Sequence, residues 1–214
     1  YPAFRRENRW WLEDYALFTV LKEANHGALW YQWPEEERRP RDKARLLKTH
    51  AKAVEQVCRD QYWFWTQWGE LKDYAHQHGV QLIGDLPLAV AADSADVWAA
   101  PQLFQLDDQT LRPVCTAGVP PDYYNEKGQN WENPVYDWDA MAADGYRWWI
   151  RRIAHGMRSY DFIRLDHFRG FSEYFAIPAG QEAAMGSWRL GPGMALFQAV
   201  EKALGGPLPL LGED

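Results

Sequence analysis

Two acidic side chains directly follow strand-like, mainly apolar runs in this sequence of 214 residues. Asp166 comes after the run at 162–165, and Glu213 comes after the run at 208–211. A β/α barrel builds a site that cleaves glycosidic bonds from parallel strands that deliver carboxylates at their carboxyl ends. The spacing therefore predicts two catalytic carboxylates that face a common pocket.

The neighbours of these acids suggest a different role for each. Arg164 stands two residues before Asp166, so strand geometry points both side chains the same way. A guanidinium beside a carboxylate keeps that carboxylate ionised, which is the state of a nucleophile. A strand exit in a dry cleft favours the protonated form that a general acid needs, which suits Glu213. A structural Arg–Asp pair and an ordinary exposed acid remain the alternatives.

A third acid, Asp85, follows the strand-like run at 80–84. At a strand exit it can bind sugar hydroxyls or orient a neighbouring side chain. The alternative is a turn-forming Asp before Pro87.

The segment 118–131, GVPPDYYNEKGQNW, combines a rigid Pro-Pro pair, a flexible Gly128 and three aromatic residues. Such a loop suits a lid that stacks on a sugar and excludes water. The alternative is an irregular surface loop whose Trp131 packs inward.

Helical and strand-like patterns alternate around these acids. We expect helices at 9–24, 42–78 (broken near Thr49 and ended by Gly79), a short one capped by Asp93, one through 146–153 and one at 193–204; strands at 80–87, 161–165 and 208–211; and irregular stretches at 101–139 and 170–192. This alternation predicts an α/β fold with a parallel sheet.

Three strands cannot close a barrel of eight. We therefore expect a partial (β/α)₈ TIM barrel of about three consecutive parallel strands with long βα loops. The chain would be the central part of a catalytic barrel whose flanking parts are missing, with a helical insertion at about 1–79 and a lid-like loop at about 101–139. An independent three-stranded domain is the alternative, but it would leave strand edges open.

Composition narrows the class of partner. A net charge of −7 argues against a nucleic-acid groove or an anionic membrane surface. No apolar run is long enough to span a bilayer, and nothing resembles a signal peptide. Thirteen Trp and eleven Tyr offer flat apolar faces with polar edges, which suit sugar rings, although most of them can equally pack helices onto a sheet.

Cysteines and histidines give no sign of a metal site. Cys58 and Cys115 lack a disulfide framework and metal-ligand spacing, so we expect reduced thiols in a cytoplasmic protein. His76 and His78 lie near a helix end without a third ligand, and we expect solvated capping residues. No metal is expected, and no nucleotide or redox cofactor, because the sequence has neither G-x-G-x-x-G nor a P-loop.

Four segments together resemble the 4-α-glucanotransferases, also called amylomaltases or disproportionating enzymes, which form glycoside hydrolase family 77 in the α-amylase clan. They are IRLDHFRGF at 163–171, GDLPLAVAADSADVW at 84–98, AGVPPDYYNEKGQNWENPVYDW at 117–138 and GED at 212–214. WLEDYALF at 11–18 and the helix at 61–78 fit as well, so the resemblance covers essentially the whole chain.

The resemblance implies a (β/α)₈ barrel with inserted subdomains and assigns roles to its acids. Asp166 corresponds to the catalytic nucleophile and Glu213 to the general acid/base. Gly212 stands where the family often has Ala, a change of one small residue for another. A third catalytic Asp of the family is expected beyond Asp214.

The resemblance also implies a set of substrate-binding residues. Asp85, Arg164 and His167 would hold the sugar in the reacting subsite, while Asp122, Tyr123 and Trp131 would line the groove from the lid.

The implied activity is the transfer of α-1,4-glucan segments to a glucan or glucose acceptor by retaining double displacement. Its partners would be maltooligosaccharides and glucans from starch or glycogen, and this chain alone would be inactive. An α-amylase-like hydrolase on the same barrel and a non-catalytic glucan-binding module remain alternatives.

Overall fold

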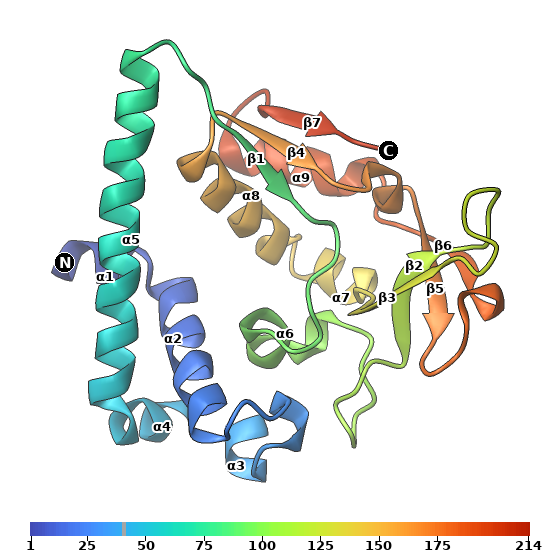
Figure 1. Ribbon diagram of the computed structural model, residues 1–214, viewed down its shortest axis with the longest axis horizontal. Coiled ribbons are helices and arrows are strands. Elements are labelled where there is room, and N and C mark those ends of the chain that lie inside the picture. Colours follow the sequence, from blue (N-terminus) through green and yellow to red (C-terminus); the bar gives the residue numbers. More distant parts are fainter. Residues whose placement is uncertain (40–41) are drawn as a thin grey trace. The chain divides into compact units, whose positions relative to one another are not determined.

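The computed structural model describes residues 1–39 and 42–214. This part of the chain divides into two compact units. Unit 1 comprises Tyr1–Leu71 and Asp93–Pro101, and unit 2 comprises Lys72–Ala92 and Gln102–Asp214. Figure 1 shows their elements along the chain. No helix of the described residues is both long and apolar enough to cross a membrane.

Unit 1 is helical. Its elements are α1 (Pro2–Glu7), α2 (Arg9–Ala24), η1 (Trp30–Gln32), α3 (Glu35–Arg38), α4 (Lys43–Thr49), α5 (Ala51–Gln77, whose last six residues belong to unit 2) and α6 (Ala95–Ala99). The predicted helix at 9–24 and the predicted break near Thr49 are both confirmed.

The core of unit 1 forms where α2 packs against α6. Leu17 and Leu21 of α2 are fully buried, four residues apart on one face of the helix. The rings of Phe18 and Trp98 meet at a tilt of 54° with centroids 5.9 Å apart, and the indole N–H of Trp98 donates to the carbonyl oxygen of Glu37 at 2.8 Å. The irregular segment around α3 is therefore tied to the same core.

The N-cap predicted for the short helix α6 is wrong by one residue. Ser94, not Asp93, accepts the hydrogen bond from the backbone N–H of Val97. The carboxylate of Asp93 is instead paired with Lys22 and accepts a hydrogen bond from the backbone N–H of Trp30 at 3.3 Å. A tertiary contact has thus displaced the local capping preference.

Unit 2 contains a parallel sheet of three strands, as predicted. Its strand order is β1 (Ile83–Leu86), β4 (Phe162–Leu165) and β7 (Leu210–Gly212). All three strands are shorter than expected. One face is buried, with Ile163 and Leu165 1% exposed, whereas Ile83 on the other face is 62% exposed. The strand predicted around Ile83 therefore exists, but it is not buried on both faces.

Helices α8 (Arg147–Ser159) and α9 (Met194–Leu204) pack against each other, and α8 also packs on β1 and β4 (Figure 1). Gly156 of α8 lies so close to β4 that a Cβ there would be 2.8 Å from Ile163. Trp149 of α8 is fully buried and contacts the ring of Phe171 edge-on, with centroids 5.1 Å apart. The central strand therefore rests on a tightly packed helix.

A second sheet of unit 2 is antiparallel and was not expected. Its strand order is β3 (Gln129–Pro134), β2 (Cys115–Val119), β5 (Glu173–Pro178) and β6 (Ser187–Leu190). The prediction of irregular structure at 101–139 and 170–192 is therefore wrong for these strands. Gly118, which the sequence analysis placed in a loop, lies in β2. Only glycine fits there, because a Cβ would be 2.1 Å from the carbonyl oxygen of Gln129 on β3.

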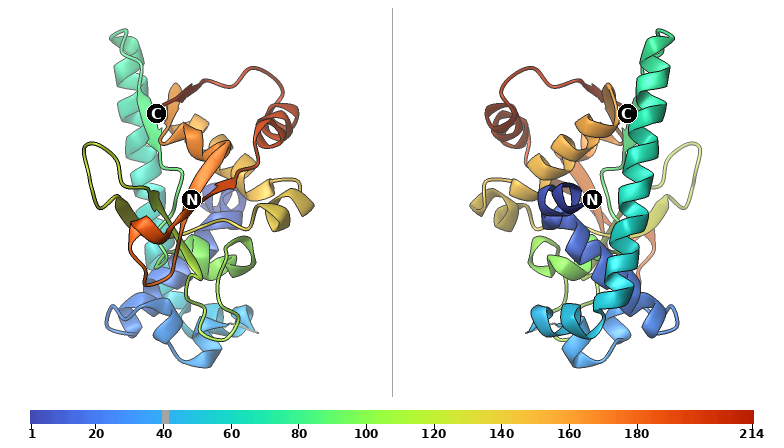
Figure 2. Two further views of the ribbon diagram at one scale, coloured as in Figure 1. Left: turned by 90° about the vertical axis from the view of Figure 1, so that its right-hand side faces the viewer. Right: turned by 90° about the vertical axis from the view of Figure 1, so that its left-hand side faces the viewer.

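Short elements complete unit 2: η2 (Pro101–Leu103), α7 (Trp138–Ala143), η3 (Phe168–Phe171) and η4 (Ala183–Met185). Figure 2 shows the connection between β2 and β3 as a loop that extends beyond the antiparallel sheet. This loop carries the Pro-Pro-Asp-Tyr-Tyr segment.

Candidate functional site

The exits of β1, β4 and β7 bring three of the predicted acids together. In the parallel register Asp85 pairs with Arg164, and Leu165 pairs with Gly212. The acids at positions 166 and 213 therefore leave their strands side by side. The prediction that both acids catalyse a reaction in a common pocket stays a prediction.

Arg164 lies at the centre of this group and contacts all three acids. Its Nε and Nη2 atoms donate to the two carboxylate oxygens of Asp85 at 3.0 and 2.7 Å. Nη2 also donates to Oδ1 of Asp166 at 3.2 Å, and Nη1 lies 3.5 Å from Oε1 of Glu213. The exposed fractions of the four side chains lie between 38% and 56%, so solvent reaches the group.

The local contacts shift the protonation of these acids in opposite directions. Hydrogen bonds from Arg164 hold the pKa of Asp85 below its usual range. The pKa of Asp166 is raised, first by burial and then by its hydrogen bond with Glu213 and the charge of Glu213, which together outweigh Arg164. The expectation that Arg164 dominates at Asp166 is therefore wrong.

The turn after β4 fixes the backbone around Glu213. His167 adopts a left-handed conformation with φ of 49°, and its backbone N–H donates to Oε2 of Glu213 at 3.3 Å. The next two backbone N–H groups, of Phe168 and Arg169, donate to the carbonyl oxygen of Glu213 at 2.7 Å and to Oδ1 of Asp214 at 2.6 Å. The sequence argument missed Asp214 and these amide contacts, and only the position of Asp214 next to Glu213 could have pointed to them.

The ring of His167 brings one lid residue to the site. Trp131 of β3 meets this imidazole edge-on, with ring centroids 5.1 Å apart. Burial lowers the pKa of His167, against the opposing charges of Asp214 and Asp166. The neutral imidazole is therefore favoured, and it can both donate and accept hydrogen bonds.

The other two predicted groove residues, Asp122 and Tyr123, have contacts within their own loop. Oδ1 of Asp122 accepts from the backbone N–H groups of Tyr124 at 2.8 Å and Asn125 at 2.6 Å. Tyr123 is 94% exposed, and its ring meets that of Tyr124 edge-on. The structure thus orders the loop tip without bringing these two side chains against the acids.

The histidines of helix α5 and its C-terminal end, His76 and His78, and the two cysteines have contacts outside this group of acids. His76 is more than a solvated cap, because its Nε2 lies 2.9 Å from Oδ2 of Asp161, whereas Nδ1 of His78 lies 2.8 Å from the carbonyl oxygen of Tyr74. Cys58 and Cys115 are free, and both are buried. Within residues 1–39 and 42–214, no group of three or more His, Cys, Asp or Glu side chains could hold a metal ion.

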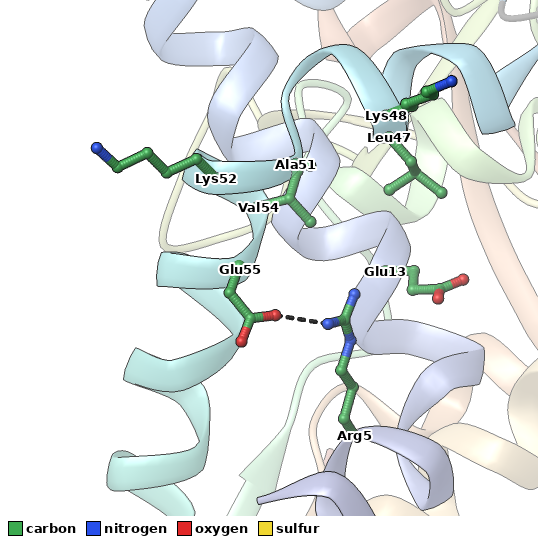
Figure 3. Close-up of a pocket in the computed structure, with 8 residues that line it drawn as sticks. All are labelled: Arg5, Glu13, Leu47, Lys48, Ala51, Lys52, Val54 and Glu55. Carbon is green, nitrogen blue, oxygen red and sulfur yellow. Dashed lines mark hydrogen bonds and ion pairs between the residues drawn. The ribbon is translucent and has the colours of Figure 1, made fainter.

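A cavity of about 530 Å³ lies in unit 1, and its lining includes none of the candidate site residues. Figure 3 shows its charged side chains, with Nη1 of Arg5 2.5 Å from Oε2 of Glu55. Arg5 and Glu55 thus compensate each other's charge in this lining.

Comparison with known proteins points to the same family by a family model and by individual relatives. Residues 1–214 match the family described as 4-alpha-glucanotransferase. Proteins named 4-alpha-glucanotransferase from Thermus thermophilus and Synechocystis are each 44% identical, over 218 and 207 residues that cover 100% and 95% of this chain. The aligned regions are 43% and 41% of those proteins, so the chain spans less than half the length of these relatives.

Solved structures agree. An amylomaltase from Streptococcus agalactiae, solved in complex with acarbose, is 38% identical and superposes with a TM-score of 0.93, covering 100% of this chain and 43% of that one. An amylomaltase from Corynebacterium glutamicum, 23% identical with a TM-score of 0.67, shows the likeness of fold alone, over 95% of this chain and 26% of that one. Together with the three parallel strands, these matches confirm the partial barrel.

Proposed function

Because this chain belongs to the 4-alpha-glucanotransferase family, we propose that the intact protein carrying it moves α-1,4-glucan segments to a glucan or glucose acceptor. The proposed mechanism is a retaining double displacement, with Asp166 as nucleophile and Glu213 as general acid/base. The substrates are maltooligosaccharides and glucans derived from starch or glycogen.

One observation carries this proposal: Asp166 and Glu213 lie at neighbouring strand ends, where the guanidinium of Arg164 is 3.2 Å from Oδ1 of Asp166 and 3.5 Å from Oε1 of Glu213. Retaining glycosidases hold their two carboxyl groups about 5–5.5 Å apart, whereas inverting enzymes need about 6.5–9.5 Å to admit a water. The proposed retention therefore requires the shorter separation between the carboxyl groups of Asp166 and Glu213.

The first step breaks the glycosidic bond. Protonated Glu213 gives its proton to the glycosidic oxygen, while ionised Asp166 attacks C1 and forms a β-glucosyl ester. The leaving glucan departs with a new 4-hydroxyl group. Asp166 must be ionised at this moment, and the positive charge of Arg164 beside it favours that state by lowering its pKa.

The second step reforms the bond on a new acceptor. Glu213, now a carboxylate, takes the proton from the acceptor 4-hydroxyl, whose oxygen attacks C1 and releases Asp166. The product has the same α-1,4 linkage as the donor. Glu213 is again protonated and Asp166 ionised, so the cycle closes.

The sugar of the reacting subsite is held by Asp85, Arg164 and His167. Asp85 is half exposed and its pKa is lowered, so it presents ionised oxygens to sugar hydroxyl groups. Arg164 fixes that carboxylate from two points, and the neutral ring of His167 adds a hydrogen-bonding edge.

Choice of a sugar acceptor over water is assigned to the lid-like region at about 101–139. Trp131 provides an aromatic face next to His167, and Asp122 orders the loop tip that presents Tyr123 to solvent. Stacking of a glucan on these rings and closure of the loop would exclude water from the ester intermediate.

The 214-residue chain itself is proposed to be inactive, as the central part of a catalytic barrel with a helical insertion at about 1–79. It spans less than half the length of its relatives, and its parallel sheet has three strands where a full barrel has eight. The free, buried thiols Cys58 and Cys115 support a cytoplasmic location.

Incubation of the intact protein with maltotriose tests the proposal. Transfer yields glucose together with longer maltooligosaccharides, whereas the alternative, an α-amylase-like hydrolase, yields only shorter sugars. Asp166→Asn should abolish turnover, and Asp73→Asn, which makes the same change at an exposed position of α5, should not. Unchanged turnover in Asp166→Asn would instead indicate a non-catalytic glucan-binding module, and disproportionation by the purified 214-residue chain would contradict its proposed inactivity.

A further inference from the structure

The structure leads us to infer that Asp214 is a positioning residue for the carboxyl group of Glu213. The inference rests on the proposed function, because it concerns the general acid/base of that reaction. The contact that carries it is the hydrogen bond from the backbone N–H of Arg169 to Oδ1 of Asp214, at 2.6 Å.

Residues 213 and 214 lie beyond the last pair of the parallel ladder, in which Leu165 pairs with Gly212. Strand pairing therefore no longer fixes their orientation. One further backbone contact, from the N–H of Glu213 to the carbonyl oxygen of Leu165 at 3.1 Å, continues the strand by one residue. The side chain of the next residue, Asp214, contacts the turn after β4 through the backbone N–H of Arg169.

That turn offers three successive backbone N–H groups, from positions 167, 168 and 169. The left-handed conformation of His167 directs neighbouring amides toward one side, and such an arrangement favours acceptors with negative charge. Two of the three amides bind oxygens of Glu213, and the third binds the carboxylate of Asp214. The turn after β4 therefore makes three hydrogen bonds to residues 213 and 214, and Asp214 accepts the third.

The attachment matters because Glu213 must reach the same anomeric carbon as Asp166. The amide of His167 approaches Oε2 of Glu213 at 3.3 Å, which is the longest of the three contacts. The ring of Phe168 also lies close to β7, since a Cβ on Gly212 would be 2.9 Å from it. Loss of the Asp214 anchor would release the turn at Arg169 and let the carboxyl group of Glu213 move.

Asp214 could also act through its charge, because its carboxylate raises the pKa of His167 against the stronger effect of burial. Three substitutions separate the two roles. Asp214→Asn keeps an acceptor oxygen and removes the charge, Asp214→Glu keeps the charge and moves the acceptor by one methylene, and Asp214→Ala removes both. Positioning predicts that only the Asn variant retains activity.

The experiment uses the intact protein and two donors. Maltotriose needs protonation of its leaving group by Glu213, whereas α-maltotriosyl fluoride carries a leaving group that departs without an acid. We expect Asp214→Ala and Asp214→Glu to lower kcat on maltotriose about 100-fold with little change in KM, because a small misplacement of a catalytic group has that effect. The first turnover of fluoride release should stay within about threefold of wild type. Asp214→Asn should keep at least about a third of the wild-type kcat.

Glu201→Ala, which removes an exposed acid from α9, is the matched control and should behave as wild type. Thermal melting identifies any variant that does not fold. If Asp214→Ala does not fold, comparison of Asp214→Asn with Asp214→Glu still distinguishes the positioning role from the charge role. Equal loss on both donors, loss in Asp214→Asn with retention in Asp214→Glu, or wild-type kcat in all three would each overturn the inference. Wild-type protein without disproportionation, or Glu213→Gln with full activity on maltotriose, would overturn the proposed function instead.

Discussion

The guanidinium of Arg164 on β4 holds the carboxylate of Asp85 on β1 at two points, 3.0 and 2.7 Å, across directly paired positions of the parallel sheet. The same guanidinium reaches the two candidate catalytic acids. One cation thus contacts three carboxyl groups, and it lowers the pKa of Asp85. This relationship leads to the first prediction.

Arg164→Met in the intact protein should shift the acidic limb of the pH profile. The guanidinium lowers the pKa of Asp166, which burial and Glu213 already raise, so its removal raises that pKa further. Asp166 must be ionised to attack, and activity should therefore be lost at higher pH as the solution is acidified. The measurement is kcat/KM for maltotriose between pH 4 and pH 8.

Arg164→Lys serves as the matched control, because it keeps the charge and loses the two-point geometry. It should lower kcat/KM about 100-fold with less displacement of the acidic limb. An Arg164→Met profile that coincides with that of wild type would contradict the role given to this residue.

A second prediction concerns the stability of unit 2 as a function of pH. The pKa of Asp161 is lowered, first by the hydrogen bond that it accepts from the backbone N–H of Leu82 at 2.8 Å and then by its contact with His76. Because the folded-state pKa lies below the unfolded value of about 3.9, the stabilisation is present above that pH and is lost as pH falls through the folded pKa.

Asp161→Asn should therefore reduce the free energy of unfolding by about 1.5–3 kcal/mol at pH 7, the usual contribution of a hydrogen bond to a charged group. The difference between variant and wild type should shrink below about pH 4. Urea denaturation at pH 7 and at pH 3.5 gives both values. A difference that is equal at the two pH values would show that the charge of Asp161 contributes nothing.

A third prediction tests the packing beneath the parallel sheet. A Cβ on Gly84 of β1 would lie 2.0 Å from the ring of Tyr160, so Gly84→Ala must displace that ring or the strand. We expect a loss of about 1–3 kcal/mol in the free energy of unfolding, and a smaller loss in the background of Tyr160→Ala, where the clash is absent.

Gly69→Ala is the contrasting substitution within helix α5. A Cβ at Gly69 would meet nothing within 4 Å, so alanine should stabilise the protein by about 0.5–1 kcal/mol through helix propensity. Equal effects of the two substitutions in urea denaturation would contradict the packing that the structure gives to Gly84.

The parallel sheet and its acids could be predicted from the sequence because each depends on a local pattern. Apolar runs before Asp166 and Glu213 identify the strands. Because the strands are parallel, their carboxyl ends lie at the same edge of the sheet. The break near Thr49 and the helix at 9–24 follow from spacing in the same way.

The antiparallel sheet could not be predicted from local pattern, because its strands contain residues that usually indicate loops. Gly118 is required by the close approach of β3, and Pro134 ends a strand at the sheet edge. The cap at Ser94 was missed for a related reason, since the partner of Asp93 is Lys22, far away in sequence. The raised pKa of Asp166 likewise depends on burial and on Glu213, which is 47 positions later.

The most direct test of the account is the covalent intermediate of the intact protein. Glu213→Gln, given α-maltotriosyl fluoride, needs no acid for the first step and lacks the base for the second, so an ester should accumulate. Mass spectrometry of the digested protein should then find one maltotriosyl group on Asp166, and none on that peptide when Asp166→Asn is added. A sugar attached to another residue, or fluoride release with inverted configuration and no adduct, would contradict the claim that these two acids act on one anomeric carbon.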